Sequence, residues 1–149
     1  MAHKVFFSFK YKSDAYRAEM IREGWVRQGN EALGFVDSAE FEKIKEQGDD
    51  AIKLWIDAQL SETSVTVVLV GEDTCVSRWV NYAVMKSKKM GKGLLGVDIS
   101  MIRDSDGKHS SCCGRFPTGY PFYRWFNDNG YNNLGKWVEQ AAEESGRDD

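Results

Sequence analysis

The chain of 149 residues lacks any apolar run near the ~20 residues that a membrane-spanning helix needs. The apolar run that begins at Val5 is also too short for the core of a signal peptide. Neither sign of charge is in large excess, because the formal net charge is −3 and the sequence pI is about 5.5. This balance gives no reason to expect a nucleic acid or an anionic membrane as a partner. We therefore expect a protein that works in the cytoplasm.

Cysteine is scarce, with Cys75 alone and Cys112 next to Cys113. An odd number of cysteines, two of them adjacent, does not make a disulfide framework, so we expect three reduced thiols. His109 precedes the pair and suggests a metal site, but a closed zinc site needs four ligands and no second cluster supplies the others. We expect no metal, and we interpret Cys75 as a small buried side chain.

Two phosphate-handling sites common in α/β domains are also missing. A dinucleotide or flavodoxin-type phosphate loop needs glycine or hydroxyl groups after the first strand. No glycine lies between Met1 and Ile21. A phospho-receiver needs two acids after the first strand and an aspartate at the end of the third, because these acids hold Mg²⁺. Here the first strand ends at Phe9 and the third ends at Val70 and Gly71, so the sequence excludes both kinds of site.

What the sequence does contain is a regular alternation of apolar strands with amphipathic helices. The strands are nearly continuous apolar runs, which is typical of parallel strands covered on both faces. They are predicted at residues 4–9, 33–36, 65–70, 94–99 and 122–126, the last at an edge of the sheet. This pattern predicts an α/β fold, a doubly wound, five-stranded, mainly parallel sheet with helices on both faces. We expect one domain over residues 1–142 and a frayed acidic tail at 143–149.

Three segments between the strands bear on the site. Ser13 is a candidate N-cap for a helix that runs to about Gln28, and Asp14 in its first turn favours the helix dipole. Residues 38–48 are charged and predict a loop or a short exposed helix. Residues 100–121 contain turn formers without periodicity, and so long an irregular stretch is more often functional or mobile than inert.

The stretch from residue 64 to residue 90 organises the rest of the chain. A buried strand at 65–70 leads through a polar turn to Ser77, which can cap the helix that follows. Trp79 and Ala83, four residues apart, share one face of that helix. Ligands of open α/β sheets bind beyond the carboxyl ends of the strands, so chemistry is expected at the first turns of this helix. A methyl group at Ala83 therefore stands where a site would need a functional group.

Several segments carry a resemblance to a known family. They are Val5-Phe6-Phe7-Ser8-Phe9-Lys10-Tyr11, Phe35-Val36-Asp37, residues 64–71, Arg78-Trp79-Val80-Asn81-Tyr82 with Met85-Lys86-Ser87, and Gly130-Tyr131 with Trp137-Val138. Together they resemble the TIR family, and more closely the prokaryotic TIR-like proteins of the Thoeris antiphage defence system. The resemblance spans nearly the whole chain, with residues 100–121 its weakest part. It implies a flavodoxin-like, doubly wound fold.

The resemblance also implies cleavage of NAD⁺ between nicotinamide and ribose. NAD⁺ would be the substrate, and no further cofactor is implied. The ADP-ribose product, open or cyclic, would activate a partner effector as a second messenger, and assembly into a homo-oligomer is common in the family. The nicotinamide ring is cationic in NAD⁺ and becomes neutral when it leaves, so its departure needs no general acid. A carboxylate beside the ribose would stabilise an oxocarbenium-like transition state.

In the family that carboxylate belongs to a Glu on the helix after the third strand, and the matching position here holds Ala83. The resemblance thus implies an inactivated form, slowed on the order of 10²–10³ or more. Three explanations stay open: an engineered Glu-to-Ala change, a natural pseudoenzyme that binds nucleotide or a partner, or a shifted alignment in which Glu72 or Asp73 supplies the charge. The alternative function is a non-catalytic TIR interaction or nucleotide-sensing module.

The other candidate site residues surround the same crevice. Ser8, Phe9 and Tyr11 lie where the first strand ends and either hold the nucleotide or form strand core and surface loop. Asp37 either contacts a ribose hydroxyl or caps the next helix. Trp79 is expected to line the site as an aromatic wall for nicotinamide, with packing against Tyr11 or Phe9 as the alternative.

Overall fold

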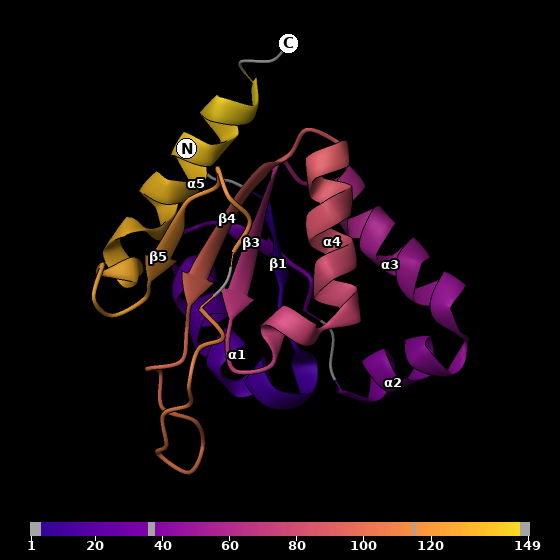
Figure 1. Cartoon of the computed structure of the whole chain (residues 1–149), viewed down its shortest axis with the longest axis horizontal. Coiled ribbons are helices and arrows are strands. Elements are labelled where there is room, and N and C mark those ends of the chain that lie inside the picture. The colour runs from indigo at the N-terminus through magenta and orange to yellow at the C-terminus, as the bar shows by residue number, and fades with distance from the viewer. Residues whose placement is uncertain (1–3, 36–37, 115, 147–149) are drawn as a thin grey trace.

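The computed structural model describes residues 4–35, 38–114 and 116–146 and contains one five-stranded sheet (Figure 1). The strand order is β2-β1-β3-β4-β5, and all neighbouring strands are parallel. The strands are β1 Lys4–Ser8, β2 Glu31–Leu33, β3 Val65–Val70, β4 Gly93–Asp98 and β5 Phe122–Arg124. The predicted parallel α/β sheet is confirmed, with β3 central and every residue of β3 buried, and β5 at an edge.

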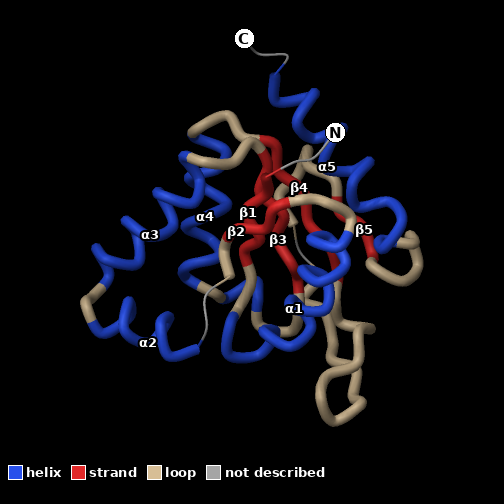
Figure 2. The backbone as a smooth tube through the Cα atoms, turned by 180° about the vertical axis from the view of Figure 1, so that it is seen from behind, coloured by secondary structure: helices blue, strands red, loops and turns tan. Residues whose placement is uncertain are grey.

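The described part of the chain contains five α-helices. They are α1 Tyr11–Arg27, α2 Ser38–Glu46, α3 Asp49–Ser61, α4 Arg78–Lys89 and α5 Gly130–Gly146, with a short 3₁₀ helix, η1, at Thr74–Val76. Figures 1 and 2 show α1 and α5 on one face of the sheet and α3 and α4 on the other. Among the described helices, none has both the length and the apolar composition to cross a bilayer.

The pleat of the strands divides the core between the two faces. Val5, Phe7 and Phe9 pack with residues of α1 and α5, such as Trp25, while Phe6 packs with α3 and α4. Because β1 continues into α1 on one face and the adjacent β3 continues into α4 on the other, the chain diverges at their carboxyl ends. This is the switch point at which ligands bind in open α/β sheets.

Element boundaries differ from the sequence expectations in a few places. Strand β2 covers Glu31–Leu33 and shares only Leu33 with the predicted range 33–36, because Gly34 takes a positive φ of 93° that breaks extended backbone. Helix α1 begins at Tyr11 without a side-chain cap, so Ser13 lies inside the helix rather than at its N-cap. The charged segment at 38–48 forms helix α2, and α5 continues to Gly146 into the expected tail.

The expectation of three reduced thiols is wrong in this structure. Cys75 of η1 and Cys113 of the loop after β4 form a disulfide, and Cys112 is the free thiol. The two partners are 38 residues apart in sequence, and neither belongs to a recognisable cysteine motif. They meet because the segments that follow β3 and β4 both emerge at the carboxyl edge of the sheet. The bond ties the long loop to the turn that precedes α4.

Candidate functional site

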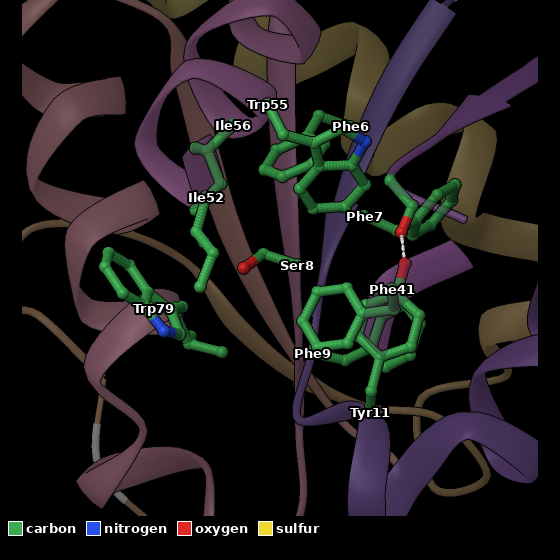
Figure 3. Close-up of a pocket in the computed structure, with 12 residues that line it drawn as sticks. Phe6, Phe7, Ser8, Phe9, Tyr11, Phe41, Ile52, Trp55, Ile56 and Trp79 are labelled. Carbon is green, nitrogen blue, oxygen red and sulfur yellow. Dashed lines mark hydrogen bonds between the residues drawn. The ribbon is translucent and has the colours of Figure 1, made fainter. Parts of the chain in front are cut away.

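An aromatic cavity lies between β1, α3 and the start of α4, at the carboxyl end of β1 (Figure 3). Its lining residues are Phe6, Phe7, Ser8, Phe9, Tyr11, Gly34, Phe41, Ile52, Trp55, Ile56, Trp79 and Val80. Figure 3 shows the Ser8 hydroxyl pointing toward Ile52 and Trp79. Four of the predicted site residues, Ser8, Phe9, Tyr11 and Trp79, are therefore brought together around one cavity.

A stack of three rings closes this cavity on one side. Phe9 and Tyr11 stack with centroids 4.4 Å apart, and Tyr11 and Phe41 stack at 4.3 Å. The Tyr11 hydroxyl donates a hydrogen bond to the Gly34 carbonyl, which holds the middle ring in place. The enclosed volume is about 30 Å³, room for one or two water molecules but not for a nicotinamide ring. A ligand of that size requires movement of the ring stack.

A second hollow lies outside the stack and shares four of its residues with the cavity. It measures about 160 Å³ and is lined by Phe9, Lys10, Tyr11, Lys12, Phe41, Lys45, Ser77 and Trp79. Three lysines among the lining residues make this hollow basic, and Lys45 also lies over the Phe41 ring at 5.7 Å. We call this hollow the outer basin. Its charge suits an anionic group such as a phosphate.

The first turn of α4 positions Trp79. Ser77 caps the helix as predicted, because its side-chain oxygen accepts a hydrogen bond from the Val80 backbone N–H at 3.4 Å. The Arg78 guanidinium lies 4.5 Å from the Trp79 ring centroid and forms an ion pair with Asp49 at 2.8 Å. Trp79 packs edge-on against Tyr82, with the ring centroids 6.1 Å apart.

Ala83 lies one helical turn beyond Trp79, on the same face of α4. It is fully buried in an apolar cluster with Phe6, Ile52, Ile56 and Leu60. Three members of that cluster, Phe6, Ile52 and Ile56, also line the aromatic cavity. Position 83 thus adjoins the cavity through shared walls, although Ala83 itself does not line it.

Among the residues that the structure describes, no carboxylate lines the aromatic cavity or the outer basin. Asp37, a predicted contact to the nucleotide, lies outside the described residues. Glu72, which a shifted alignment would bring into the site, lines a different cleft on the α1 side of the sheet. The first turns of α4 therefore offer aromatic and hydroxyl groups but no negative charge.

Four aromatic residues that line the cavity, Phe6, Phe7, Phe41 and Trp55, were not among the predicted site residues. Trp55 lines the cavity and packs edge-on against Phe6 and Phe41. Phe41 lies in the charged segment that was predicted to be exposed, and it forms the outer ring of the stack. One large aromatic side chain within nine mostly polar residues was the available signal.

The cleft on the α1 side of the switch point contains a buried acid. The Asp14 side chain is 1% exposed, and burial is the main cause that raises its pKa to about 6. Nearby Asp73 and Glu72 raise the pKa further, whereas Arg17 and a hydrogen bond from Ser13 oppose them. The Arg17 guanidinium lies 3.8 Å from Asp14 Oδ1, too far for a hydrogen bond. Asp14 is therefore a buried acid with a raised pKa, whereas its sequence position indicated only a charge that favours the helix dipole.

Comparison with known proteins agrees with this geometry. The model of the family described as "Thoeris protein ThsB, TIR-like domain" matches residues 6–104, which include the end of β1, all of β3 and α4, and every residue that lines the aromatic cavity. The chain is also 36% identical over 146 residues to a protein of Bacillus cereus (strain MSX-D12) named "Putative cyclic ADP-D-ribose synthase ThsB1". That match covers 97% of this chain and 76% of the relative. The chain belongs to the TIR-like domain family of the Thoeris protein ThsB.

Proposed function

We propose that this protein is a Thoeris TIR-domain enzyme that cleaves NAD⁺ and converts the ADP-ribose part into a cyclic second messenger for antiphage defence. The observation that carries the proposal is the match, over 97% of the chain, to a relative whose name describes a cyclic ADP-D-ribose synthase. The aromatic cavity at the carboxyl end of β1 supports it, because a flat, apolar nicotinamide ring binds between such walls.

Different parts of NAD⁺ would occupy the aromatic cavity and the outer basin. Once the ring stack of Phe9, Tyr11 and Phe41 moves, nicotinamide would enter beside Trp79. The diphosphate would then lie in the outer basin near its lysines. The bond from ribose C1′ to the pyridinium nitrogen breaks, and its electron pair leaves with neutral nicotinamide. Water or an adenine nitrogen then attacks C1′ and loses a proton, which gives ADP-ribose or its cyclic form.

A Glu at position 83 would complete this site. Its side chain would extend along the walls that the apolar cluster shares with the cavity, toward the ribose beside Trp79. Ala83 contributes no charge there, and the described part of the chain offers no replacement carboxylate. We therefore propose that the chain as written is slowed by a factor on the order of 10²–10³ or more.

The alternative is a TIR module that binds a nucleotide or a partner without chemistry. The observation that favours it is Ala83 itself, which is fully buried and well packed among Phe6, Ile52, Ile56 and Leu60. Good packing alone accounts for an alanine at this position, without the loss of a carboxylate. Under this reading the basin and cavity serve recognition of an ADP-ribose-type ligand.

The deciding experiment compares the protein as written with Ala83→Glu and Ala83→Gln, each incubated with NAD⁺. We expect Ala83→Glu to release nicotinamide at least 10²-fold faster than the other two, because only it adds a carboxylate of the right length. Mass analysis of the second product distinguishes ADP-ribose from a cyclic isomer. If Ala83→Glu is folded and releases no nicotinamide at any protein concentration, the enzyme proposal is wrong and the binding module is favoured.

The remaining parts of the proposal concern partners and place. The product would act on an effector protein as a diffusible signal, and the enzyme would become fully competent in a homo-oligomer. The assay at several protein concentrations, beside a measurement of mass in solution, tests the second point. We expect the protein to act in the cytoplasm, where NAD⁺ is abundant.

A further inference from the structure

The polar cleft on the α1 side of the switch point has no part in the proposed reaction. It measures about 460 Å³ and lies across the sheet from the aromatic cavity. All of its lining side chains are polar, among them Ser13, Asp14, Arg17, Glu72, Asp104 and Lys108. Its size is that of pockets that hold small molecules, and its position at the carboxyl ends of β1 and β3 is where ligands bind in this fold.

Asp14 is one of the residues that line this cleft, and one of its carboxylate oxygens has no hydrogen-bond donor among the described residues. Asp14 Oδ2 is buried and accepts no hydrogen bond from any residue that the structure describes. A buried carboxylate oxygen without a donor costs free energy, since water no longer solvates it. Such an atom in a native fold calls for an explanation, and a bound donor group provides one.

Arg17 forms an ion pair with Asp14 Oδ1 at 3.8 Å but donates no hydrogen bond to Oδ2. Its Nε donates to the Ile102 carbonyl at 2.6 Å, and its Nη2 donates to the Lys108 carbonyl at 2.9 Å. The guanidinium is thereby used to hold the loop that forms the outer wall, and it lies 3.8 Å from both Asp14 and Asp104. The wall is itself well built, because Asp104 Oδ1 accepts the backbone N–H groups of Asp106 and Lys108 at 2.9 Å each.

The charge of the cleft selects the kind of donor. Three carboxylates, Asp14, Glu72 and Asp104, face two basic side chains, Arg17 and Lys108, and Asp73 lies near enough to act on Asp14. An anion would add to this negative excess, and a neutral hydroxyl group would leave it unchanged. A cation that carries N–H donors would satisfy both the charge and the unpaired oxygen.

We propose that this cleft is a second ligand site, which binds a small organic cation through a primary ammonium group held by Asp14. The ammonium group has three N–H donors on a compact charge, which suits a cleft lined by carboxylate oxygens. The site is separate from the aromatic cavity and does not depend on NAD⁺ cleavage.

The test uses three four-carbon probes with different end groups. Putrescine carries two ammonium groups, 1,4-butanediol two hydroxyls and succinate two carboxylates. Each is titrated into the full-length ¹⁵N-labelled protein, and the backbone amides of Ser13, Gly71 and Ser110 are followed by NMR. We expect saturable shifts at these amides with putrescine, and at least tenfold weaker binding of the other two probes.

Variants locate the site. Asp14→Asn keeps the size of the side chain and is expected to weaken putrescine binding at least tenfold. Glu72→Gln, in an exposed turn where folding is not at risk, should weaken it about threefold. Glu23→Gln, which changes an exposed acid on α1, the helix that also holds Asp14, serves as the matched control and should bind as the parent does.

The proposal is overturned by any of three results. Equal binding of butanediol or succinate would remove the charge argument. Full affinity in both Asp14→Asn and Glu72→Gln would place the cation elsewhere. Shifts spread over surface acids without saturation would mean ordinary counterion attraction and no built site.

Discussion

The carboxylate of Asp14 lies against the backbone of Gly71, in the space that a side chain at residue 71 would occupy. A Cβ there would lie 2.5 Å from Asp14 Oδ2 and 2.6 Å from Oδ1. Glycine at the end of β3 is therefore what allows the first turn of α1 to approach the sheet. This contact joins the two segments that diverge at the switch point.

Gly71→Ala is accordingly expected to lower the free energy of unfolding by about 1–3 kcal/mol, because the methyl group displaces a buried carboxylate. Urea denaturation measures the change. Gly135→Ala is the control, since nothing lies within 4 Å of the corresponding Cβ in α5, and it should leave stability unchanged or raise it by up to ~1 kcal/mol. Equal stability of the parent and Gly71→Ala would contradict the close approach.

Asp14 should also impose a pH dependence on folding. Burial raises its pKa in the folded protein to about 6, above the ordinary value of 3.8. The folded state therefore binds this proton more tightly than the unfolded chain. The stabilisation is complete below about pH 4 and is lost as the pH rises through about 6.

The measurement compares the parent with Asp14→Asn by urea denaturation from pH 4 to pH 8. The parent should lose up to about 3 kcal/mol relative to Asp14→Asn over this range, since one pKa unit corresponds to 1.36 kcal/mol. Other titrating groups cancel in this difference. A difference that stays constant with pH would mean that Asp14 titrates normally.

The sheet could be predicted from the sequence because its strands are continuous apolar runs, as in Val65–Val70, and such runs admit few other structures. Strand β2 was misplaced because Glu31, Ala32 and Leu33 carry neither β-branched nor aromatic side chains. Its place is set by tertiary contacts, including the hydrogen bond from Trp25 Nε1 to the Glu31 carbonyl.

The lining of the aromatic cavity was predictable where it depends on the ends of strands and helices. Ser8, Phe9, Tyr11 and Trp79 follow from the position of β1 and the cap of α4, and they do line one cavity. Phe41 could not be predicted, because its role depends on how α2 folds back over Tyr11. The same holds for the Cys75–Cys113 bond, whose partners are brought together only by the order of the strands.

That disulfide makes a testable contribution to stability. It closes a loop of 38 residues, and cross-links of this size typically contribute about 2–4 kcal/mol by restricting the unfolded chain. Under oxidising conditions, Cys75→Ser should lose about that much relative to the parent. Cys112→Ser is the control and should behave as the parent does, since Cys112 is free.

A reducing agent should lower the stability of the parent to that of Cys75→Ser and leave Cys75→Ser itself unchanged. Thiol counting on protein isolated under non-reducing conditions checks the pairing independently. Three free thiols in such protein, with no effect of the reductant, would contradict the bond. The reducing cytoplasm opposes disulfides in general, so this count also bears on where the protein works.

The last prediction concerns the lysines of the outer basin, which can be tested without catalysis by binding ADP-ribose to the chain as written. Replacing Lys10 and Lys12 together by Gln removes two positive charges from the lining that would face the diphosphate. We expect calorimetry to show about tenfold weaker binding. Hydrogen bonds to charged groups contribute about 1.5–3 kcal/mol each, and water replaces part of that contribution when the lysines are removed. The affinity should also depend less on salt than in the parent.

Lys136→Gln, an exposed lysine on α5, is the control for net charge and should bind normally. Ribose 5-phosphate has one phosphate instead of two, so the double substitution should lower its affinity less than that of ADP-ribose. An equal loss of affinity for both ligands would mean that the lysines act only through the overall charge of the protein.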